Sequence, residues 1–123
     1  MSDEVADFLE ERRIAFERGT KLAGRSGRGW TIDFHTHTPS RSALLYVLST
    51  GNRASARSVV DHVVAAWVDL NHLAVGAQPM SFVSLFDDTL DVWTTEDFRQ
   101  LEPLSELARW SQPDEFARVL TAT

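Results

Sequence analysis

The sequence contains no cysteine, a single lysine and no long apolar run. Without cysteine, the chain can form neither a disulfide scaffold nor a thiolate site. No apolar run approaches the ~18 residues that a membrane span needs. The first residues, MSDEVADFLEERR, are acidic where a signal peptide is basic. We therefore expect a protein of the reducing cytoplasm that does not contact a membrane.

Several catalytic and ion-binding motifs are also missing. The glycine-rich stretch GRSGRG lacks the lysine of a phosphate-binding P-loop, and it is typical of a tight hairpin turn instead. No Gly-x-Ser-x-Gly elbow is present, so a serine hydrolase of that type is not indicated. The acidic stretch FDDTLD lacks the length and pattern of an EF-hand, and we interpret it as a turn before a helix.

The composition is that of an ordinary globular protein, but its charges are segregated. The chain has 123 residues, 43% apolar and 24% charged, and we expect a single domain over residues 1–123. Its net charge of −6 divides into −5 over residues 1–11, +7 over residues 12–57 and −8 over residues 58–123. A basic middle segment can meet a phosphate backbone. Alternatively, the three blocks neutralise one another in the fold.

Hydrophobic periodicity predicts the order α-β-β-β-α-β-α. Helix caps are expected at Ser2, at Ser55 and at Thr94 with Asp97, and Pro113 is expected in the first turn of the last helix. The expected elements are a helix over 3–12, strands over 14–22, 30–37, 43–50 and 80–89, a helix over 54–73, two helical pieces over 94–110 separated by Pro103, and a helix over 111–120.

This order predicts an α/β (α+β) fold with a three- to four-stranded mixed sheet flanked by helices. The helix over 54–73 is long enough to be a crossover, so the strands on either side of it should be parallel. Three strands joined by tight turns and flanked by helices is also the core order of the restriction-endonuclease-like nucleases, which this arrangement resembles.

The stretch TIDFHTHT raises the question of a metal site. On a strand, Asp33, His35 and His37 share one face, and two imidazoles with a carboxylate could hold zinc, manganese or iron. IDFHTHT also resembles the first motif of the PHP phosphoesterases. That family needs a much larger barrel and further ligands, so we interpret the match as a decoy. The alternative is that both histidines are ordinary, partly exposed strand residues.

Nuclease chemistry is not indicated. The restriction-endonuclease-like enzymes hold a metal with an acid on the second strand and an acid two residues before a lysine on the third. Asp33 stands where the first acid is expected, but the third strand, ALLYVLST, has neither acid nor lysine. Glu17 is a distant substitute, and the one lysine is Lys21. The fold is therefore expected to be kept and the chemistry lost.

An ordered set of short motifs resembles an uncharacterised prokaryotic and phage family, a domain of unknown function. That family's pattern has a Gly-Lys-Ser-Gly turn, a Phe-Asp-Phe strand, an aromatic-Ala-Trp-x-Asp run, a Leu-Asn-Asp strand end and a late Trp-Ser. The matching stretches here are GRSG (24–27), IDF (32–34), AAWVD (65–69), LFDD (85–88) and WSQPDEF (110–116). The chain departs from the pattern at His35-Thr36-His37 and at LFDD. The resemblance implies a setting in mobile elements or phage–host conflict. It does not indicate any particular activity.

We therefore predict a non-catalytic binding or regulatory protein with a protein or nucleic-acid partner and no cofactor. The predicted surface for an anionic partner consists of Arg25, Arg28, Arg41, Arg53 and Arg57. The acidic C-terminal half would suit a basic partner, including the nucleic-acid channel of an effector, as in an anti-CRISPR inhibitor or an immunity protein. The alternatives are a divalent-metal-dependent phosphoesterase or nuclease that uses Asp33, His35 and His37, and a subunit of an obligate homo-oligomer.

Overall fold

Two strands at the middle of the sheet are buried on both faces. The structure, a computed structural model, describes residues 1–122. β3 (Arg41–Leu48) is a continuous apolar run from Ala43 onward, and β4 (Ser81–Phe86) is largely apolar. Most of their residues are buried, and the rest are half-buried. Strands covered on both faces have this composition. The two strands pair in parallel, as predicted from the crossover helix between them.

The sheet has five strands in the order β1-β2-β3-β4-β5. β1, β2 and β3 are antiparallel neighbours, whereas β3, β4 and β5 are parallel neighbours. The remaining elements are α1 (Ser2–Glu11), β1 (Ala15–Ala23), β2 (Gly29–Thr38), α2 (Arg53–Asp69), the 3-10 helix η1 (Asn71–Ala74), α3 (Thr95–Leu101), β5 (Glu106–Arg109) and α4 (Pro113–Thr121).

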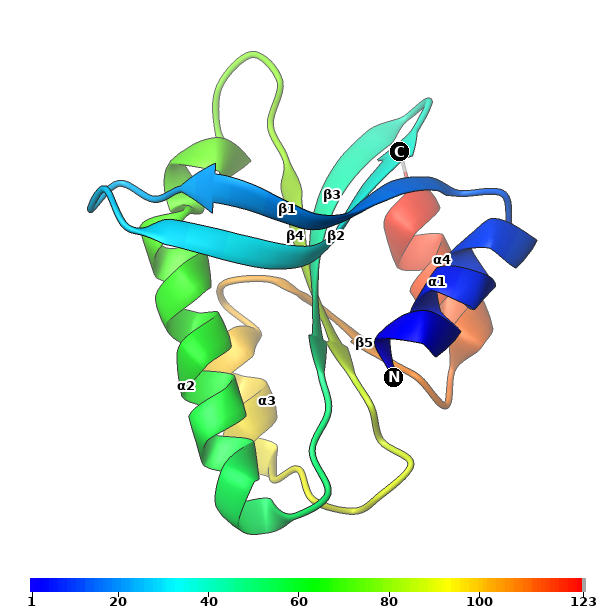
Figure 1. Cartoon of the computed structure of the whole chain (residues 1–123), viewed down its shortest axis with the longest axis vertical. Coiled ribbons are helices and arrows are strands. Elements are labelled where there is room, and N and C mark those ends of the chain that lie inside the picture. Colours follow the sequence, from blue (N-terminus) through cyan, green and yellow to red (C-terminus); the bar gives the residue numbers. More distant parts are fainter. Residues whose placement is uncertain (123) are drawn as a thin grey trace.

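Helices cover both faces of the central strands, so the molecule has three layers (Figure 1). On one face, Leu44, Tyr46 and Leu48 of β3 pack with α2 and α3 around the fully buried Trp67. On the other face, Leu45 of β3 packs with α1 and α4 around Phe116. The two hydrophobic clusters are thus separated by β3 and β4.

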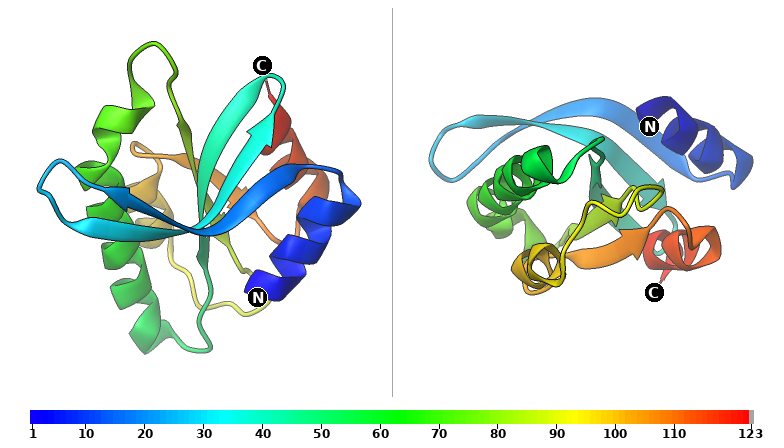
Figure 2. Two further views of the ribbon diagram at one scale, coloured as in Figure 1. Left: turned by 45° about the horizontal axis from the view of Figure 1, so that its top comes forward. Right: turned by 90° about the horizontal axis from the view of Figure 1, so that it is seen from below.

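The β1–β2 hairpin leaves the plane of the sheet and extends over α2 (Figure 2). β2 pairs with β3 only from Phe34 onward, and its first residues pair with β1 alone. Gly19 of β1 has φ +63°, a conformation that glycine adopts without strain. Trp30 and Ile32 consequently pack on the α2 cluster, whereas Phe34, on the same side of β2, packs on the α1 and α4 cluster.

The helix starts agree with the sequence at α3 and α4 but not at α1 and α2. The N-cap of α1 is Met1 rather than Ser2, which is the first helical residue and forms no side-chain cap. Thr94 and Asp97 form the predicted capping box, and Pro113 is the first residue of α4. The cap of α2 is Asn52 rather than Ser55, because the Asn52 side chain accepts the backbone N–H of Ser55.

The predicted number of strands, three to four, was too low. β5 forms where a second helical piece was expected, because residues 106–109 pair with β4 along its free edge. The mixed sheet and its α+β class are confirmed. Of residues 1–122, none belongs to a helix with the length and apolar character that crossing a membrane demands.

Candidate functional site

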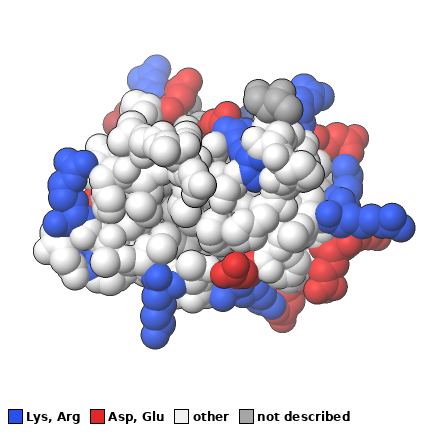
Figure 3. Space-filling model, turned by 90° about the horizontal axis from the view of Figure 1, so that it is seen from above, with Lys and Arg blue, Asp and Glu red and all other residues white. Residues whose placement is uncertain are grey.

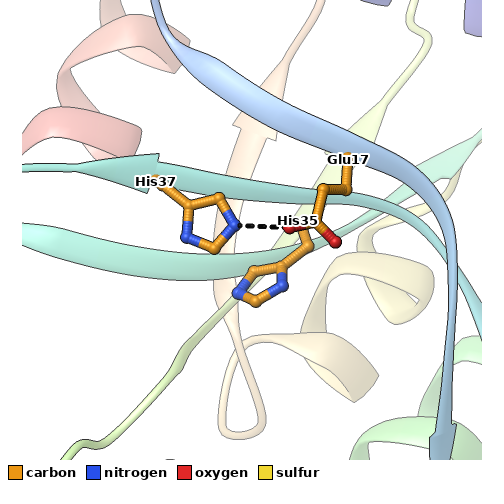
Figure 4. Close-up of side chains that lie close together, drawn as sticks. All are labelled: Glu17, His35 and His37. Atoms are coloured by element: carbon orange, nitrogen blue, oxygen red, sulfur yellow. Dashed lines mark hydrogen bonds and ion pairs between the residues drawn. The ribbon is translucent and has the colours of Figure 1, made fainter.

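A carboxylate on β1 faces two histidines on β2. The hairpin register pairs Glu17 directly with His35, and the two-residue period of a strand places His37 on the same side. Nε2 of His37 lies 3.3 Å from Oε1 of Glu17, and the two imidazole centroids are 4.1 Å apart. One ligand atom from each residue lies within 4.8 Å of the other two. Figure 4 shows the three side chains converging.

The neighbouring strand β3 holds one of these histidines in place. Nε2 of His35 lies 2.8 Å from Oγ of Ser42. Partial burial lowers the pKa of His35, the charge of His37 lowers it further, and Glu17 acts in the opposite direction. The lowered pKa favours the neutral imidazole, which keeps one nitrogen lone pair for bonding.

A polar groove opens beside His37. It has a volume of about 820 Å³ and is lined by the β2–β3 turn, the start of β4 and the segment before it. Arg41 lines this groove, but its guanidinium is already engaged. Nε donates to Ser81 at 2.8 Å, another nitrogen donates to the backbone oxygen of Val119, and the third pairs with Glu106 at 2.6 Å. The groove is thus open, but its arginine is tied to the protein.

Asp33 does not belong to the histidine cluster, in contrast to the grouping expected from the sequence. Its Oδ2 accepts the backbone N–H of Val47 at 2.8 Å, at the point where β2 diverges from β3. Asp33 lines a separate cavity of about 530 Å³, together with Tyr46 and His62. Burial raises the pKa of Asp33, and burial together with the Asp33 charge raises the pKa of Tyr46 to about 12.

The strand beside Asp33 offers no partner for metal-dependent nuclease chemistry. The residues of β3 nearest to Asp33 are Tyr46 and Val47, and the only charged residue of β3 is Arg41, near its start. Tyr46 is 4% exposed, and its hydroxyl has no hydrogen-bond partner within residues 1–122. A phenol in this place can neither bind a hard divalent ion as a carboxylate does nor supply the positive charge of a lysine.

The five arginines of the predicted anion-binding surface lie in three places. Arg25 and Arg28 lie at the tip of the β1–β2 hairpin, beside the C-terminal end of α2. Arg53 and Arg57 lie in the first turns of α2, at its opposite end. Arg41 lies in the groove described above. The face in Figure 3 is largely uncharged at its middle, with basic and acidic side chains interspersed around its edge.

The hairpin tip is fixed to α2 by one carboxylate. Asp69, the last residue of α2, accepts hydrogen bonds from the backbone and hydroxyl of Ser26 at 2.9 and 2.7 Å and from the indole of Trp30 at 2.8 Å. These hydrogen bonds, first that from Trp30 and then those from Ser26, lower the pKa of Asp69. A side chain on Gly24 would overlap this carboxylate. The tip is therefore held in a defined position.

Glu17 is the site residue that the sequence pattern alone does not reveal. As a distant substitute for a nuclease acid, it has no predicted link to His35 and His37. The hairpin turn supplies the missing signal, because pairing outward from Ser26 at the centre of the turn sets residue 17 opposite residue 35. Register therefore identifies the third member of the cluster where residue type alone does not.

No family model matches the chain. No curated protein matches it either. A solved structure described as a protein of unknown function, AF1548, is similar in fold, with a TM-score of 0.61 and 12% identity. The similarity covers 93% of this chain and 59% of that one, so this chain spans about three-fifths of the length of the solved protein. This likeness concerns the fold alone.

Proposed function

We propose that the protein is a nuclease-like α/β domain that has lost nuclease chemistry and works by binding. Its partner would be a protein or nucleic-acid component in a mobile-element or phage–host conflict setting. The observation that carries this proposal is the surroundings of Asp33, where a metal-dependent nuclease would need further charged groups.

The order of elements supports a restriction-endonuclease-like core. Three antiparallel strands are followed by a crossover helix and a parallel fourth strand, with helices on both faces. In such a core, Asp33 occupies the place of the acid on the second strand. Its carboxylate accepts a backbone N–H from β3, so one of its oxygens is already engaged in holding β2 to β3.

The hairpin tip is the proposed contact for an anionic partner. Arg28 lies over the ring of Trp30, 4.0 Å from its centroid, and Arg25 is exposed at the same turn. The carboxylate of Asp69, beside them, already accepts three hydrogen bonds. A rigid turn that presents two guanidinium groups suits the phosphate backbone of a nucleic acid.

The experiment compares two double variants that lose the same charge. Arg25→Ala/Arg28→Ala removes the two positive charges of the hairpin tip. Arg53→Ala/Arg57→Ala removes two positive charges at the other end of α2 and is the matched control. Fluorescence anisotropy with labelled single- and double-stranded DNA and RNA is recorded across a salt series. We expect only the tip variant to weaken binding and to flatten the slope of log K against log salt by about 2. Equal effects of both variants would contradict the assignment of the tip.

Cleavage is measured on the same nucleic acids with magnesium and with manganese. We expect no cleavage of any substrate. Metal-dependent cleavage that is lost in Asp33→Asn would refute the non-catalytic proposal. If the chain binds no nucleic acid at any salt concentration, the proposed partner is a protein. That protein would be identified by affinity capture from a native host. The acidic C-terminal half is then the candidate contact surface, as in an inhibitor.

Four of the five stretches that resemble the uncharacterised family meet in two pairs, which supports the proposed relationship. GRSG and AAWVD meet through Ser26 and Asp69. LFDD and WSQPDEF meet through Asp88, which accepts the backbone N–H and the hydroxyl of Ser111 at 2.9 and 2.5 Å. In both pairs, a serine donates hydrogen bonds to an aspartate of a distant element, so these motifs hold distant parts of the chain together.

A second candidate function, metal-dependent phosphoester hydrolysis, is favoured by the convergence of Glu17, His35 and His37. In this version Glu17 replaces Asp33 as the carboxylate ligand. Hydrolysis of bis(p-nitrophenyl) phosphate that requires zinc or manganese and is lost in His37→Gln would support it. Absence of turnover with either metal would eliminate it.

A further inference from the structure

We propose that Glu17, His35 and His37 form a binding site for a divalent late first-row transition ion, zinc above all. The site lies on the outer side of the β1–β2 hairpin, where two nitrogen donors of β2 face one oxygen donor of β1. The proposal does not depend on nucleic-acid binding at the hairpin tip.

The donor set selects the class of ion. Two imidazoles and one carboxylate make up the protein ligands of well-known zinc sites that keep a fourth position for water or substrate. Magnesium and calcium prefer sites composed of oxygen atoms alone. A site with two nitrogens among three donors therefore favours zinc, nickel, cobalt or copper over the hard ions.

The distances are compatible with coordination. Two donors bonded to one tetrahedral zinc ion at its usual bond lengths lie about 3.3 Å apart. The His37 and Glu17 donors are already separated by 3.3 Å, and the widest separation in the cluster is 4.8 Å or less. The Glu17 side chain is 65% exposed, so it can rotate inward while the paired backbones of β1 and β2 stay in place.

The hydrogen bonds around the cluster favour a metal ligand at His35. If Nε2 carries the proton, it donates to Oγ of Ser42, and Nδ1 keeps its lone pair. Ligating histidines in general donate their second ring N–H to such a neighbour, which fixes the ring and its tautomer. Ser42 is therefore the proposed orienting residue of the site.

The carboxylate of the site is not committed elsewhere. Within residues 1–122, the ion pair formed by Glu17 is with His37. The nearby cations are engaged, since Arg18 pairs with Asp3 and Arg41 pairs with Glu106. A bound cation would thus take the place of the direct contact between Glu17 and His37 and would link β1 to β2.

Three protein ligands leave at least one coordination position open. His37 lines the groove of about 820 Å³, and so does Ser42. A water molecule or a donor atom from a molecule in this groove can complete the coordination shell. The site is thus of the open type rather than the closed four-ligand type.

The test uses the full chain, freed of metal with a chelator and titrated with zinc in a calorimeter. Cobalt serves as a spectroscopic probe, because a nitrogen- and oxygen-ligated tetrahedral cobalt ion absorbs visible light. The variants are Glu17→Gln, His35→Gln and His37→Gln, and His62→Gln on the exposed side of α2 is the matched control. Circular dichroism without metal establishes whether each variant is folded. If a histidine variant does not fold, Glu17→Gln, at an exposed position, serves as the ligand variant instead.

We expect one zinc ion per chain, a loss of affinity of at least tenfold in each ligand variant, and unchanged affinity in His62→Gln. The zinc-dependent rise in melting temperature should disappear in the same three variants. The proposal is overturned if the natural chain binds no stoichiometric zinc, or if folded ligand variants bind zinc as tightly as His62→Gln does. Because the readout is metal affinity, its failure is distinct from a failure of nucleic-acid binding. Failure to bind zinc would also remove the hydrolysis candidate, whereas zinc binding without turnover would remove hydrolysis alone.

Discussion

Replacement of Ser84 by alanine tests the polar chain that crosses the core. The indole N–H of Trp67 on α2 donates to Oγ of Ser84 on β4 at 2.9 Å. Ser84 lies 2.7 Å from Oγ of Ser105, which itself donates to the backbone oxygen of Leu101 at 3.1 Å. Ser105 thus uses its proton on Leu101, and Ser84 donates to Ser105.

The size of the expected loss in stability follows from the burial of the Trp67 indole N–H, which loses its acceptor. Trp67 and Ser84 are both 0% exposed, so water cannot replace the lost acceptor. An orphaned, buried donor costs about 1–3 kcal/mol of unfolding free energy. For a chain of this length, that loss lowers the melting temperature by about 4–12 °C. The rings of Trp67 and Phe82, stacked at 4.5 Å, should stay in place, because the change adds no volume.

The assay is urea unfolding followed by far-ultraviolet circular dichroism. Ser58→Ala, on the exposed side of α2, is the matched control and should stay within about 0.5 kcal/mol of the natural chain. A cycle with Trp67→Phe, alone and combined with Ser84→Ala, should give a coupling energy of about 1 kcal/mol. A folded Ser84→Ala chain as stable as Ser58→Ala would refute the argument that this chain of hydrogen bonds holds α2 to β4.

Two further predictions concern the hairpin tip. Gly24→Ala should lower the melting temperature by several degrees in a thermal scan, because its methyl group would displace Asp69. Gly29→Ala is the control and should leave the melting temperature nearly unchanged, because the space around Gly29 is open. Equal effects of the two substitutions would contradict this account. Asp69→Asn should be less stable than the natural chain at pH 7, and the gap should narrow as the pH falls below about 4. Hydrogen bonds from Trp30 and Ser26 hold the pKa of Asp69 in the folded chain below its ordinary value. The stability that these bonds contribute is therefore complete above the pKa of Asp69 in the unfolded chain and is lost as the carboxylate protonates. Urea midpoints measured from pH 3 to pH 7 test this, and a constant gap would contradict it.

Local patterns determine most of the fold, and the exceptions depend on distant contacts. The alternation around Trp30 and Phe34 and the continuous apolar run of β3 predict strands of the right type in the right place. β5 is different, because its four residues, Glu106 to Arg109, offer little alternation, and they become a strand only by pairing with β4. The direction of the hairpin is also non-local, since it depends on the backbone conformation at Gly19 and on the anchoring at Asp69.

The sequence predicts only part of the candidate site, because the rest depends on contacts between strands. The pattern His-x-His on a strand predicts that His35 and His37 share a side, and they do. The same parity also assigns Asp33 to that side, but β2 diverges from β3 there, and the backbone of Val47 captures the carboxylate. Glu17 joins the histidines through the hairpin register, a relation between two strands that periodicity within one strand does not contain.

The ends of the strand order determine how another polypeptide could approach. β1 is one border of the sheet, and it carries Glu17, Arg18 and Lys21 around the kink at Gly19. β5 is the other border and is only four residues long. Charged, bent or very short borders discourage a foreign strand from extending a sheet. Assembly through shared backbone hydrogen bonds, and with it fibrous aggregation, is therefore disfavoured at both borders, and a partner should be recognised through side chains.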